Sequence, residues 1–360
     1  HFLTCCCCRA TTPNNFTIPS THSQQRHSLL PPRRIHLGHP MASLFATRAA
    51  VPRHVGRVQR RSTGTAVRAS AENEQPAVIE QPKKKVSGPK AERFKVADGQ
   101  LGNVAGAALP FVMRAGSGAL ASGYSVSLVK DEGQTDYTLG SFNGQRILET
   151  SKISTFARPE KPLEIYEFEG CPFCKKVREA VSILDLEVIF RPCPQGGSTW
   201  RPKAIELGGK KMFPYMVDPN TDTAMYESDD IIKYLFTKYG DGEVPLALRL
   251  GAVTALTAGL GLIARGGAGS RARPSKLPEQ PLVLWGYEAS PFVKLVRERL
   301  CELEIPYLLK PGSRGSPRRD ELMALTGTYQ APFLEVTKPH KDLHSRGMAA
   351  CLTVVSEHRL

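Results

Sequence analysis

Two cysteines separated by two residues stand where one sequence pattern gives way to another. Residues 163–181 read LEIYEFEGCPFCKKVREAV, and the pair is Cys171 and Cys174. An alternating apolar run precedes the pair, as in a β-strand, and apolar side chains at helical spacing follow it. A cysteine at a helix start faces free backbone N–H groups and the positive end of the helix dipole, which stabilise a thiolate. We therefore expect Cys171 to be the nucleophile and the less exposed Cys174 to resolve a mixed disulfide.

A zinc site and a pair of inert core cysteines are the other interpretations. Zinc generally takes four ligands, and the stretch from residue 55 to residue 339 offers no histidine and no second CxxC pair. We therefore expect no metal there, and no cysteine–histidine hydrolase. Inert buried cysteines stay possible, and we interpret Cys193 as a packing residue.

The elements around the pair predict an α/β fold over residues 160–240. After the first strand and helix come two further helices and three further strands. The strands are EVIFRP (187–192), MFPYMVD (212–218) and AMY (224–226), and the helices are WRPKAIELGG (200–209) and ESDDIIKYLFTKYG (227–240). The order is β-α-β-α-β-β-α, with the cysteine pair at the first strand-to-helix turn.

This order, with CPFC, Phe213-Pro214 and Glu227-Ser228, resembles glutaredoxins and the N-terminal domains of glutathione S-transferases. The first module also resembles that of membrane-associated prostaglandin E synthase-type proteins. The resemblance implies a thioredoxin-like fold and glutathione as co-substrate. It implies a cis peptide before Pro214, a Phe213 backbone that pairs with the cysteinyl part, and Glu227 and Ser228 at the γ-glutamyl end. The glutathione-binding set it implies is Phe173, Phe213, Pro214, Glu227 and Ser228. Glu227 could alternatively be only a helix-capping acid.

The pattern then recurs at an offset of 119 residues. LVLWGYEASPFVKLVRERLCELEIPYLLKP, starting at Leu282, aligns with the segment that starts at Leu163. Ser290 and Val293 replace the two cysteines, so this copy has no redox pair. Ser290 could correspond to the hydroxyl that activates glutathione in transferases, but we favour a helix N-cap. We expect tandem thioredoxin-like folds whose second, degenerate copy (281–336) is incomplete, because the tail 337–360 shows neither a clear fourth strand nor a closing helix opened by Asp/Glu-Ser.

The net charge of +14 comes mostly from the first 70 residues, which contain ten Arg, no Lys and no acid. The remainder is nearly balanced, so we expect no nucleic-acid partner. The Arg-rich, acid-free stretch from Met41 is typical of an organellar transit peptide and resembles a plant plastid leader. Residues 72–335 are likewise similar to plant plastid proteins with tandem domains. We therefore predict a chloroplast location, in the stroma or at a membrane, with residues 1–40 upstream of the start. A disordered basic tail is the alternative.

Three further segments complete the predicted organisation. Residues 71–95 are charged and Pro-bearing, typical of a flexible linker. Residues 96–155 predict a small extension with a helical segment and strands at YSVSLV (124–129) and YTLG (137–140). Within 241–280, the uncharged run 250–264 predicts a connecting helix too short to span a membrane. We favour a buried helix, and the flanking arginines leave attachment to a membrane surface open.

Two classes of function remain. The first is a glutathione-dependent thiol–disulfide oxidoreductase that uses Cys171 on protein disulfides or glutathionylated proteins. The second is a non-catalytic thioredoxin-fold binding or scaffold protein. Transferase-like activity is a further alternative, although no all-helical C-terminal domain follows the modules. An iron–sulfur cluster bridged between two chains is a minority interpretation.

Overall fold

A computed structural model of the chain describes residues 96, 98–133, 136–336, 343–346 and 348–356. All of them belong to one unit, residues 77–360. The predicted leader (1–70) and linker (71–95) lie outside the described residues and stay predictions.

The first module has the predicted order β-α-β-α-β-β-α. Val177, Ala180 and Val181 of its first helix, and Leu184 directly after it, recur at helical spacing and pack into the core. The elements are β4 (Leu163–Glu167), α2 (Pro172–Ile183), β5 (Val188–Pro192), α3 (Trp200–Gly208), β6 (Tyr215–Asp218), β7 (Thr223–Met225) and α4 (Ser228–Tyr239). The thioredoxin-like fold predicted for this stretch is confirmed.

The second module has the same seven elements, so the expectation that this copy is incomplete is wrong. Strand β11 pairs antiparallel with β10, and α9 packs on α7. No Asp/Glu-Ser pair opens α9, but Cys351, Val354 and Val355 are buried at helical spacing. Burial of that face is enough to form the helix. The elements are β8 (Leu282–Trp285), α7 (Pro291–Glu302), β9 (Tyr307–Lys310), α8 (Arg318–Thr326), β10 (Phe333–Val336), β11 (Leu343–Arg346) and α9 (Met348–Ser356).

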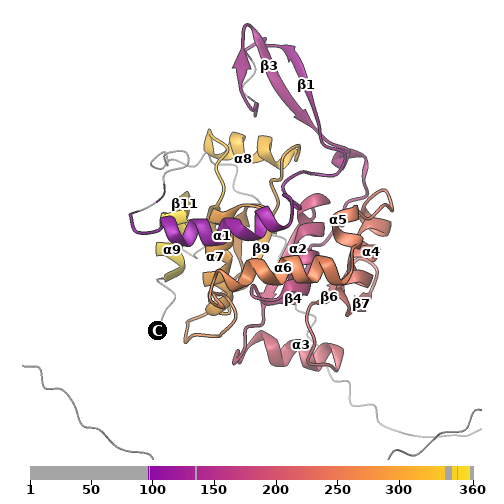
Figure 1. Cartoon of the computed structure of the whole chain (residues 1–360), viewed down its shortest axis with the longest axis vertical. Coiled ribbons are helices and arrows are strands. Elements are labelled where there is room, and N and C mark those ends of the chain that lie inside the picture. The colour runs from indigo at the N-terminus through magenta and orange to yellow at the C-terminus, as the bar shows by residue number, and fades with distance from the viewer. Residues whose placement is uncertain (1–95, 97, 134–135, 337–342, 347, 357–360) are drawn as a thin grey trace, which may run out of the picture. The chain divides into compact units, whose positions relative to one another are not determined.

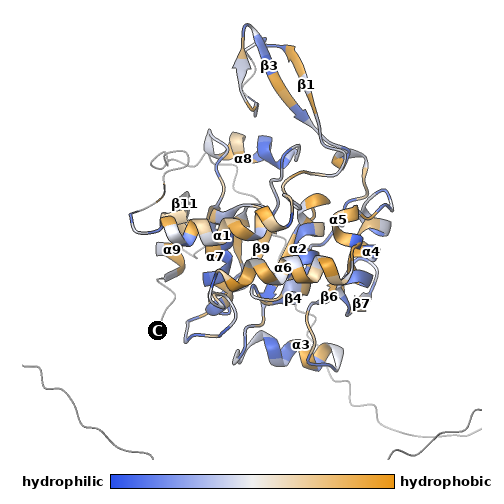
Figure 2. Ribbon diagram, viewed as in Figure 1, coloured by the Kyte–Doolittle hydropathy of each residue, from blue (hydrophilic) through white to orange (hydrophobic). Residues whose placement is uncertain are grey.

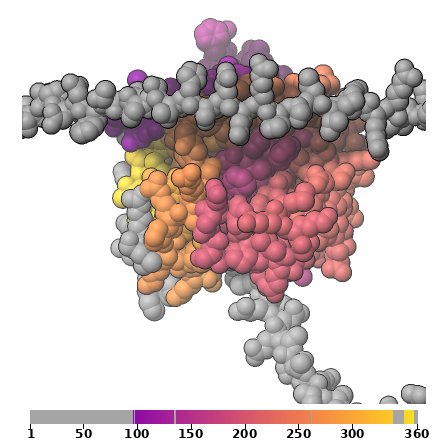
Figure 3. All heavy atoms as spheres, turned by 60° about the horizontal axis from the view of Figure 1, so that its bottom comes forward, coloured from indigo at the N-terminus to yellow at the C-terminus, as the bar shows by residue number. Residues whose placement is uncertain are grey.

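One eight-stranded sheet runs through both modules, in the order β11-β10-β8-β9-β5-β4-β6-β7. At its centre β5 and β9 pair antiparallel, with Ile189 opposite Leu308. Each module thus covers one edge strand of the other, which removes two exposed edges. Figure 3 shows the two modules packed directly against each other.

The extension before the first module contains α1 (Leu101–Met113), β1 (Ser125–Lys130), β2 (Ser141–Phe142), β3 (Gln145–Thr150) and the short 3-10 helix η1 (Ile153–Thr155). The three strands form a small sheet of their own that projects from the modules (Figure 1). The strand predicted at 137–140 is wrong. The partner of β1 is β3, with Leu128 opposite Ile147.

Between the modules lie α5 (Leu246–Arg249) and α6 (Ala252–Ile263). The connecting helix is present, but the preferred interpretation of it as buried is wrong for its outer face, since Leu256 is 62% exposed and Ile263 is 74% exposed. Only its inner face, with Thr254 and Ala258, is fully buried. Helix α6 packs against α1 and α2, and α1 in turn packs against α7 (Figure 1).

The helix before each module and the loop that follows it form a second internal repeat. After α1 the chain reads RAGSG from Arg114, and after α6 it reads RGGAG from Arg265. Each loop extends the other repeat's module. Residues 119–121 exchange backbone hydrogen bonds with Arg314, and residues 270–272 exchange the equivalent bonds with Gln195. The two halves of the chain are therefore intertwined rather than strung one after the other.

Candidate functional site

Cys171 occupies the N-cap position of α2. Its backbone is extended (φ −95°, ψ 122°), and its Sγ accepts the backbone N–H of Cys174 at 3.2 Å. Pro172 is the first helical residue, where its missing N–H leaves no donor unpaired. The structure thus places this sulfur at the amide end of the helix, where an anion is stabilised.

The two sulfurs have opposite acidity. The hydrogen bond from the Cys174 side chain is the main cause that lowers the pKa of Cys171 below its ordinary value, against a smaller opposing effect of burial. Burial raises the pKa of Cys174 well above its ordinary value, and the bond to Cys171 raises it further. One thiol of the pair is therefore the better anion and the other the better proton donor.

Both cysteines are well covered. Cys171 is 4% exposed and Cys174 is 1% exposed, whereas the Phe173 ring between them is 49% exposed. A reagent can reach the sulfur of Cys171 only through a narrow opening or after a local movement.

The cations that follow the pair do not gather around the thiol. Lys175, Lys176 and Arg178 are all buried, and their charges are paired with Glu288, Asp229 and Glu167. Of the three, Arg178 lowers the pKa of Cys171, and the opposing effect of Glu167 is larger. Burial raises the pKa of Glu167 itself to about 7, despite the neighbouring guanidinium.

The peptide bond between Phe213 and Pro214 is cis, as is Ala331-Pro332 in the second module. Register places Pro214 at the end of β4 that leads to the thiol, since Tyr215 pairs with Tyr166 there. The Phe213 ring packs edge-on against Phe168, with centroids 6.1 Å apart, and the Phe168 carbonyl accepts the N–H of Cys171. The cis-proline loop and the cysteine loop are therefore in contact.

Arg201 belongs to the same neighbourhood and was missed by the sequence reasoning. Its guanidinium lies over the Phe213 ring, 4.7 Å from the centroid, and donates hydrogen bonds to the carbonyls of Cys193 and Pro194. In the second module, the guanidinium of Arg319 likewise donates hydrogen bonds to two backbone carbonyls, those of Gly312 and Ser313. The recurrence of this arginine 118 residues later was the signal that could have identified it.

Glu227 and Ser228 open α4. Lys176 in α2 binds Asp229, so the first turn of α4 lies beside the start of α2. Glu227 has a left-handed backbone (φ 67°, ψ 112°), which is strained for a residue with a side chain. Its side chain is exposed and makes no capping hydrogen bond, which argues against the capping alternative. Ser228 is 5% exposed.

The loop after α6 forms a further wall beside the thiol. A Cβ on Gly170 would lie 1.9 Å from the Ser270 hydroxyl, so only glycine fits there. A Cβ on Gly269 would in the same way lie 2.7 Å from the Glu169 Cβ. The residue just before Cys171 is therefore held by a loop of the second repeat.

The second module has the same helix start and the same cis-proline, but no cysteine at the N-cap. Ser290 is the N-cap of α7, and its hydroxyl accepts the N–H of Val293 at 3.4 Å. Met348 is the first residue of α9, where the first module has Ser228. The N-cap interpretation of Ser290 is therefore the one that the geometry favours.

A buried ion cluster joins the two modules behind their cysteine and serine turns. Lys175 binds Glu288 at 2.7 Å, and Lys294 binds Glu169 at 2.9 Å, so each lysine reaches across to the other module. Arg178 and Arg297 each bind both Glu169 and Glu288, with nitrogen–oxygen distances of 2.6–3.4 Å. The cluster consists of Glu169, Lys175, Arg178, Glu288, Lys294 and Arg297, and every member is at most 4% exposed.

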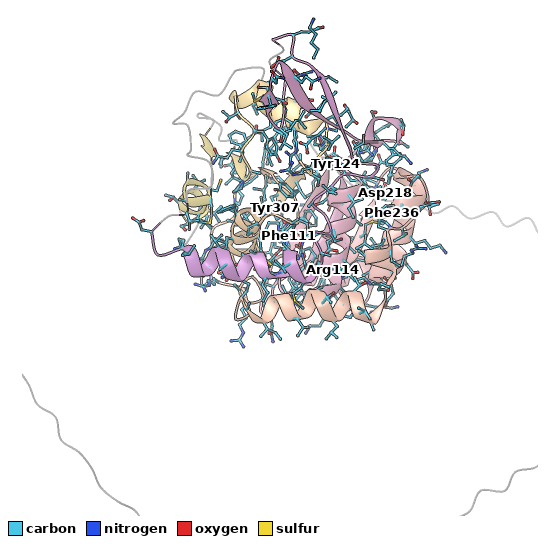
Figure 4. The ribbon with its side chains drawn as sticks, turned by 45° about the horizontal axis from the view of Figure 1, so that its top comes forward. Phe111, Arg114, Tyr124, Asp218, Phe236 and Tyr307 are labelled. Carbon is cyan, nitrogen blue, oxygen red and sulfur yellow. The ribbon has the colours of Figure 1, made fainter. Side chains whose placement is uncertain are left out.

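The cations of the cluster overcome the cost of burying its acids. Burial alone raises the pKa of Glu169, but Arg178, Arg297 and Lys294 outweigh it and bring that pKa down to about 2. The pKa of Glu288 is lowered in the same way. At each side of the cluster another arginine binds a helix acid at 2.8 Å, Arg114 with Glu179 and Arg265 with Glu298; Figure 4 labels Arg114 at the end of α1.

Within the described residues, no group of three or more His, Cys, Asp or Glu side chains is arranged to hold a metal ion. In the same part of the chain no helix has the length and apolar character that crossing a membrane requires.

Comparison with known proteins agrees with this geometry. Residues 165–243 and 284–343 both match the family "Glutathione S-transferase, N-terminal domain". A search of curated proteins finds no match.

Two solved structures are similar over part of the chain. Both are of the Bombyx mori glutathione transferase BmGSTD1, one of them in complex with GTT, and each is 24% identical with a TM-score of 0.21. The match covers 23% of this chain and 38–39% of theirs, so the chain spans about two fifths of their length. The family match by itself shows that two segments of this chain, one in each module, carry the sequence pattern of a glutathione S-transferase N-terminal domain.

Proposed function

We propose that the protein is a glutathione-dependent thiol–disulfide oxidoreductase that uses Cys171. The observation that carries the proposal is the position of its sulfur at the N-terminus of α2, where it accepts the N–H of Cys174 and has a lowered pKa. A thiolate is the reactive form in disulfide exchange.

The reaction needs two exchanges. The Cys171 thiolate attacks the glutathione sulfur of a mixed disulfide, forming a Cys171–glutathione disulfide and releasing the substrate as a thiolate that takes up a proton. A second glutathione thiolate then attacks this intermediate, which yields oxidised glutathione and restores the Cys171 thiolate. Alternatively the Cys174 thiol loses its proton and displaces glutathione, which closes an intramolecular disulfide that external glutathione reduces.

Glutathione binding is part of the proposal and rests on the first module alone. We assign to glutathione the backbone at the cis Phe213-Pro214 bond, the exposed Phe173 ring, and Glu227 with Ser228 at the start of α4. A helix start favours a carboxylate, and the Glu227 carboxylate can pair with an ammonium group. The second module has neither a thiol at the start of α7 nor a Glu-Ser pair before α9, so we assign one glutathione to each chain.

A non-catalytic thioredoxin-fold binding or scaffold function is the second candidate. The observation in its favour is the 4% exposure of Cys171. A thiol that never becomes accessible would leave the module as a structural unit or binding partner only.

Turnover of a glutathione mixed disulfide decides between the two. We expect the full chain to reduce it with glutathione, Cys171→Ser to lose activity by at least about a thousandfold, and Cys174→Ser to keep a monothiol reaction. Cys193→Ser serves as a control, since Cys193 is buried and its Sγ donates to the Arg191 carbonyl. A folded wild-type chain that shows no turnover and no alkylation of Cys171 would establish the scaffold function instead.

The location of the protein belongs to the proposal as well. The Arg-rich, acid-free composition of residues 41–70 supports import into plastids. N-terminal sequencing of the native protein should then begin near Ser70 or Ala71. A native protein that retains residues 41–70 would contradict it.

A further inference from the structure

The loop after α6 contacts the turn that carries the nucleophile. This loop is residues 265–273, and in it Ser270 lies against Gly170, the residue before Cys171. An added Cβ on Gly170 would come 1.9 Å from the Ser270 hydroxyl oxygen, well inside van der Waals contact. Helix α6, coloured mostly as hydrophobic in Figure 2, packs against α2 and leads into this loop. A residue of the second repeat therefore defines the space beside the cysteine turn.

The loop is fixed to both modules. On the first module, the Ser270 carbonyl accepts the N–H of Gln195 at 2.7 Å. On the second module, Arg265 at the start of the loop binds Glu298 of α7 at 2.8 Å, and the two side chains are only 12% and 5% exposed. Ser270 can therefore hold Gly170 in one place, because the loop cannot move away without breaking these bonds.

The equivalent contact in the second module has a different composition. The loop after α1 places Ala119 where the loop after α6 places Ser270, since their carbonyls accept equivalent N–H groups at 2.8 Å and 2.7 Å. The residue before Ser290 is Ala289, where the first module has Gly170. Both pairs have two side-chain heavy atoms between them, but in the first module both atoms belong to the loop residue and one is a hydroxyl oxygen. The cysteine turn thus has no side chain of its own at this position, and the other repeat fills the space.

The position of this turn decides how well the helix start holds the thiolate. The Cys171 Sγ accepts the N–H of Cys174 at 3.2 Å, and the Cys171 N–H donates to the Phe168 carbonyl. Gly170 is bonded directly to Cys171, so a movement of Gly170 is passed to the sulfur, and a misplacement of about 1 Å can cost a reaction about a hundredfold. We propose that Ser270 is a positioning residue for Cys171, through which the second repeat, which lacks the CxxC pair, holds the nucleophile of the first module.

The inference rests on the proposed use of Cys171 as nucleophile, and it gives the second repeat a part in that chemistry. The titratable and charged groups that shift the pKa of the Cys171 thiol are Cys174, Glu167 and Arg178. None of the three belongs to the loop after α6. Exchanges among glycine, alanine and serine leave every charge in place, so a change in the pH dependence of the thiol would report its position.

Alkylation of Cys171 in the full chain tests the positioning, with iodoacetamide at a series of pH values and peptide mass as the readout. Gly170→Ala forces the turn or the loop to move. It should slow alkylation at pH 7 by at least about tenfold and bring the midpoint nearer the ordinary thiol value of about 8.5. Ser270→Ala leaves a gap and should change both in the same direction by less. The double variant Gly170→Ala, Ser270→Ala has the alanine pair of the second module and should return to within about twofold of the wild type.

The matched control is Ala119→Ser with Ala289→Gly, because it makes the reverse exchange in the second module and leaves the cysteine turn untouched. It should alkylate as the wild type does. A double variant at least as slow as Gly170→Ala would overturn the proposal, and so would a wild-type pH profile in either folded single variant. Thermal unfolding shows which chains are folded. Where Gly170→Ala does not fold, a folded Ser270→Ala with the wild-type profile overturns the proposal by itself.

Turnover of a glutathione mixed disulfide by the same chains separates this inference from the proposed function. We expect kcat to fall with the alkylation rate in Gly170→Ala and the KM for glutathione to stay unchanged, since neither Gly170 nor Ser270 belongs to the glutathione-binding set. A wild-type chain without turnover would refute the oxidoreductase function and leave the alkylation result standing.

Discussion

The two modules have the same strand-to-helix turn and use it differently. In the first, Cys171 caps α2 and a second cysteine lies one turn on; in the second, Ser290 caps α7 in the same geometry and Val293 follows. The hydrogen bond from the helix amide is common to both, at 3.2 Å and 3.4 Å. The side chain at the N-cap therefore decides whether the helix start stabilises a thiolate or only accepts a capping hydrogen bond. The backbone that holds this side chain, which we call the frame, is the same in both modules.

The shared frame also explains why the second module can lose its cysteines without losing its structure. The ion cluster draws three residues from each module, and each acid is neutralised partly by the other module. A buried ion pair is a weak source of net stability, but removal of one partner is costly. We infer that the cluster fixes how the modules meet, and four predictions follow from the contrast between frame and chemistry.

Removal of one acid from the cluster should have the largest effect. Glu169→Gln and Glu288→Gln each leave buried cations without their counter-charge, so we expect each to lower the free energy of unfolding by about 3–5 kcal/mol. Urea titration followed by circular dichroism measures it. Glu206→Gln is the control, since Glu206 forms an exposed pair with Lys203 and should change stability by less than about 0.5 kcal/mol. Two separate transitions in either cluster variant would show that the modules are not one cooperative unit.

Loss of Glu227 should weaken glutathione binding by about 1.5–3 kcal/mol, because a charge-assisted bond is removed. Titration calorimetry of Glu227→Ala measures it. Asp230→Ala removes the same charge from the first turn of α4 without touching the strained position, and it should not weaken binding. Unchanged affinity in Glu227→Ala would remove that residue from the site while leaving the thiol chemistry intact.

The reactivity of Cys171 should depend on pH with a midpoint below the ordinary thiol value of about 8.5. A thiol is protonated and unreactive below its pKa. The lowered pKa of Cys171 therefore extends its reactivity to lower pH, whereas the raised pKa of Cys174 keeps that thiol protonated and unreactive over the same range. At pH 7 we expect iodoacetamide to label Cys171 at least about tenfold faster than Cys174. In Cys174→Ser a hydroxyl, which is a stronger hydrogen-bond donor than a thiol, replaces the Cys174 side chain, and the midpoint should shift. Equal labelling of both cysteines would break the contrast between them.

The smallest effect should come from the second module. Ser290→Ala removes a helix cap and should cost about 1 kcal/mol, measured by thermal unfolding. Ser290→Cys should keep the cap and create a second labelled thiol, yet add no turnover, because Met348 stands where the first module has Ser228. New turnover from Ser290→Cys in a Cys171→Ser background would show that the frame alone suffices for catalysis.

The sequence predicted the modules well because their signals are local. Alternation in β4, helical spacing in α2 and the cysteine between them lie within twenty residues of one another. The structure of the closing elements was missed, because β11 is held by backbone pairing with β10 and α9 by burial of three apolar residues, neither of which needs the Asp/Glu-Ser signal.

Long-range partners were beyond the sequence reasoning. Glu288, the acid partner of Lys175 and Arg178, lies more than a hundred residues away along the chain, so the pairing could not be predicted from the residues around the cysteines. The repeated RxGxG after α1 and α6 was visible, and it marks where each loop crosses to the other module. The packing of the loop after α6 against Gly170, the residue before Cys171, could not be predicted from the residues around the thiol.

The central pairing of β5 with β9 has a consequence for how the chain is made. When the first module leaves the ribosome, the outer edge of β5 has no partner, because β9 is synthesised only after α4, α6 and α7. Through that interval the nascent chain exposes an unpaired strand edge next to buried-type apolar residues, the kind of surface that pairs with other chains. The first module can then close its sheet only by waiting for the second, and a ribosome that stalls between the modules leaves a product that chaperones must hold.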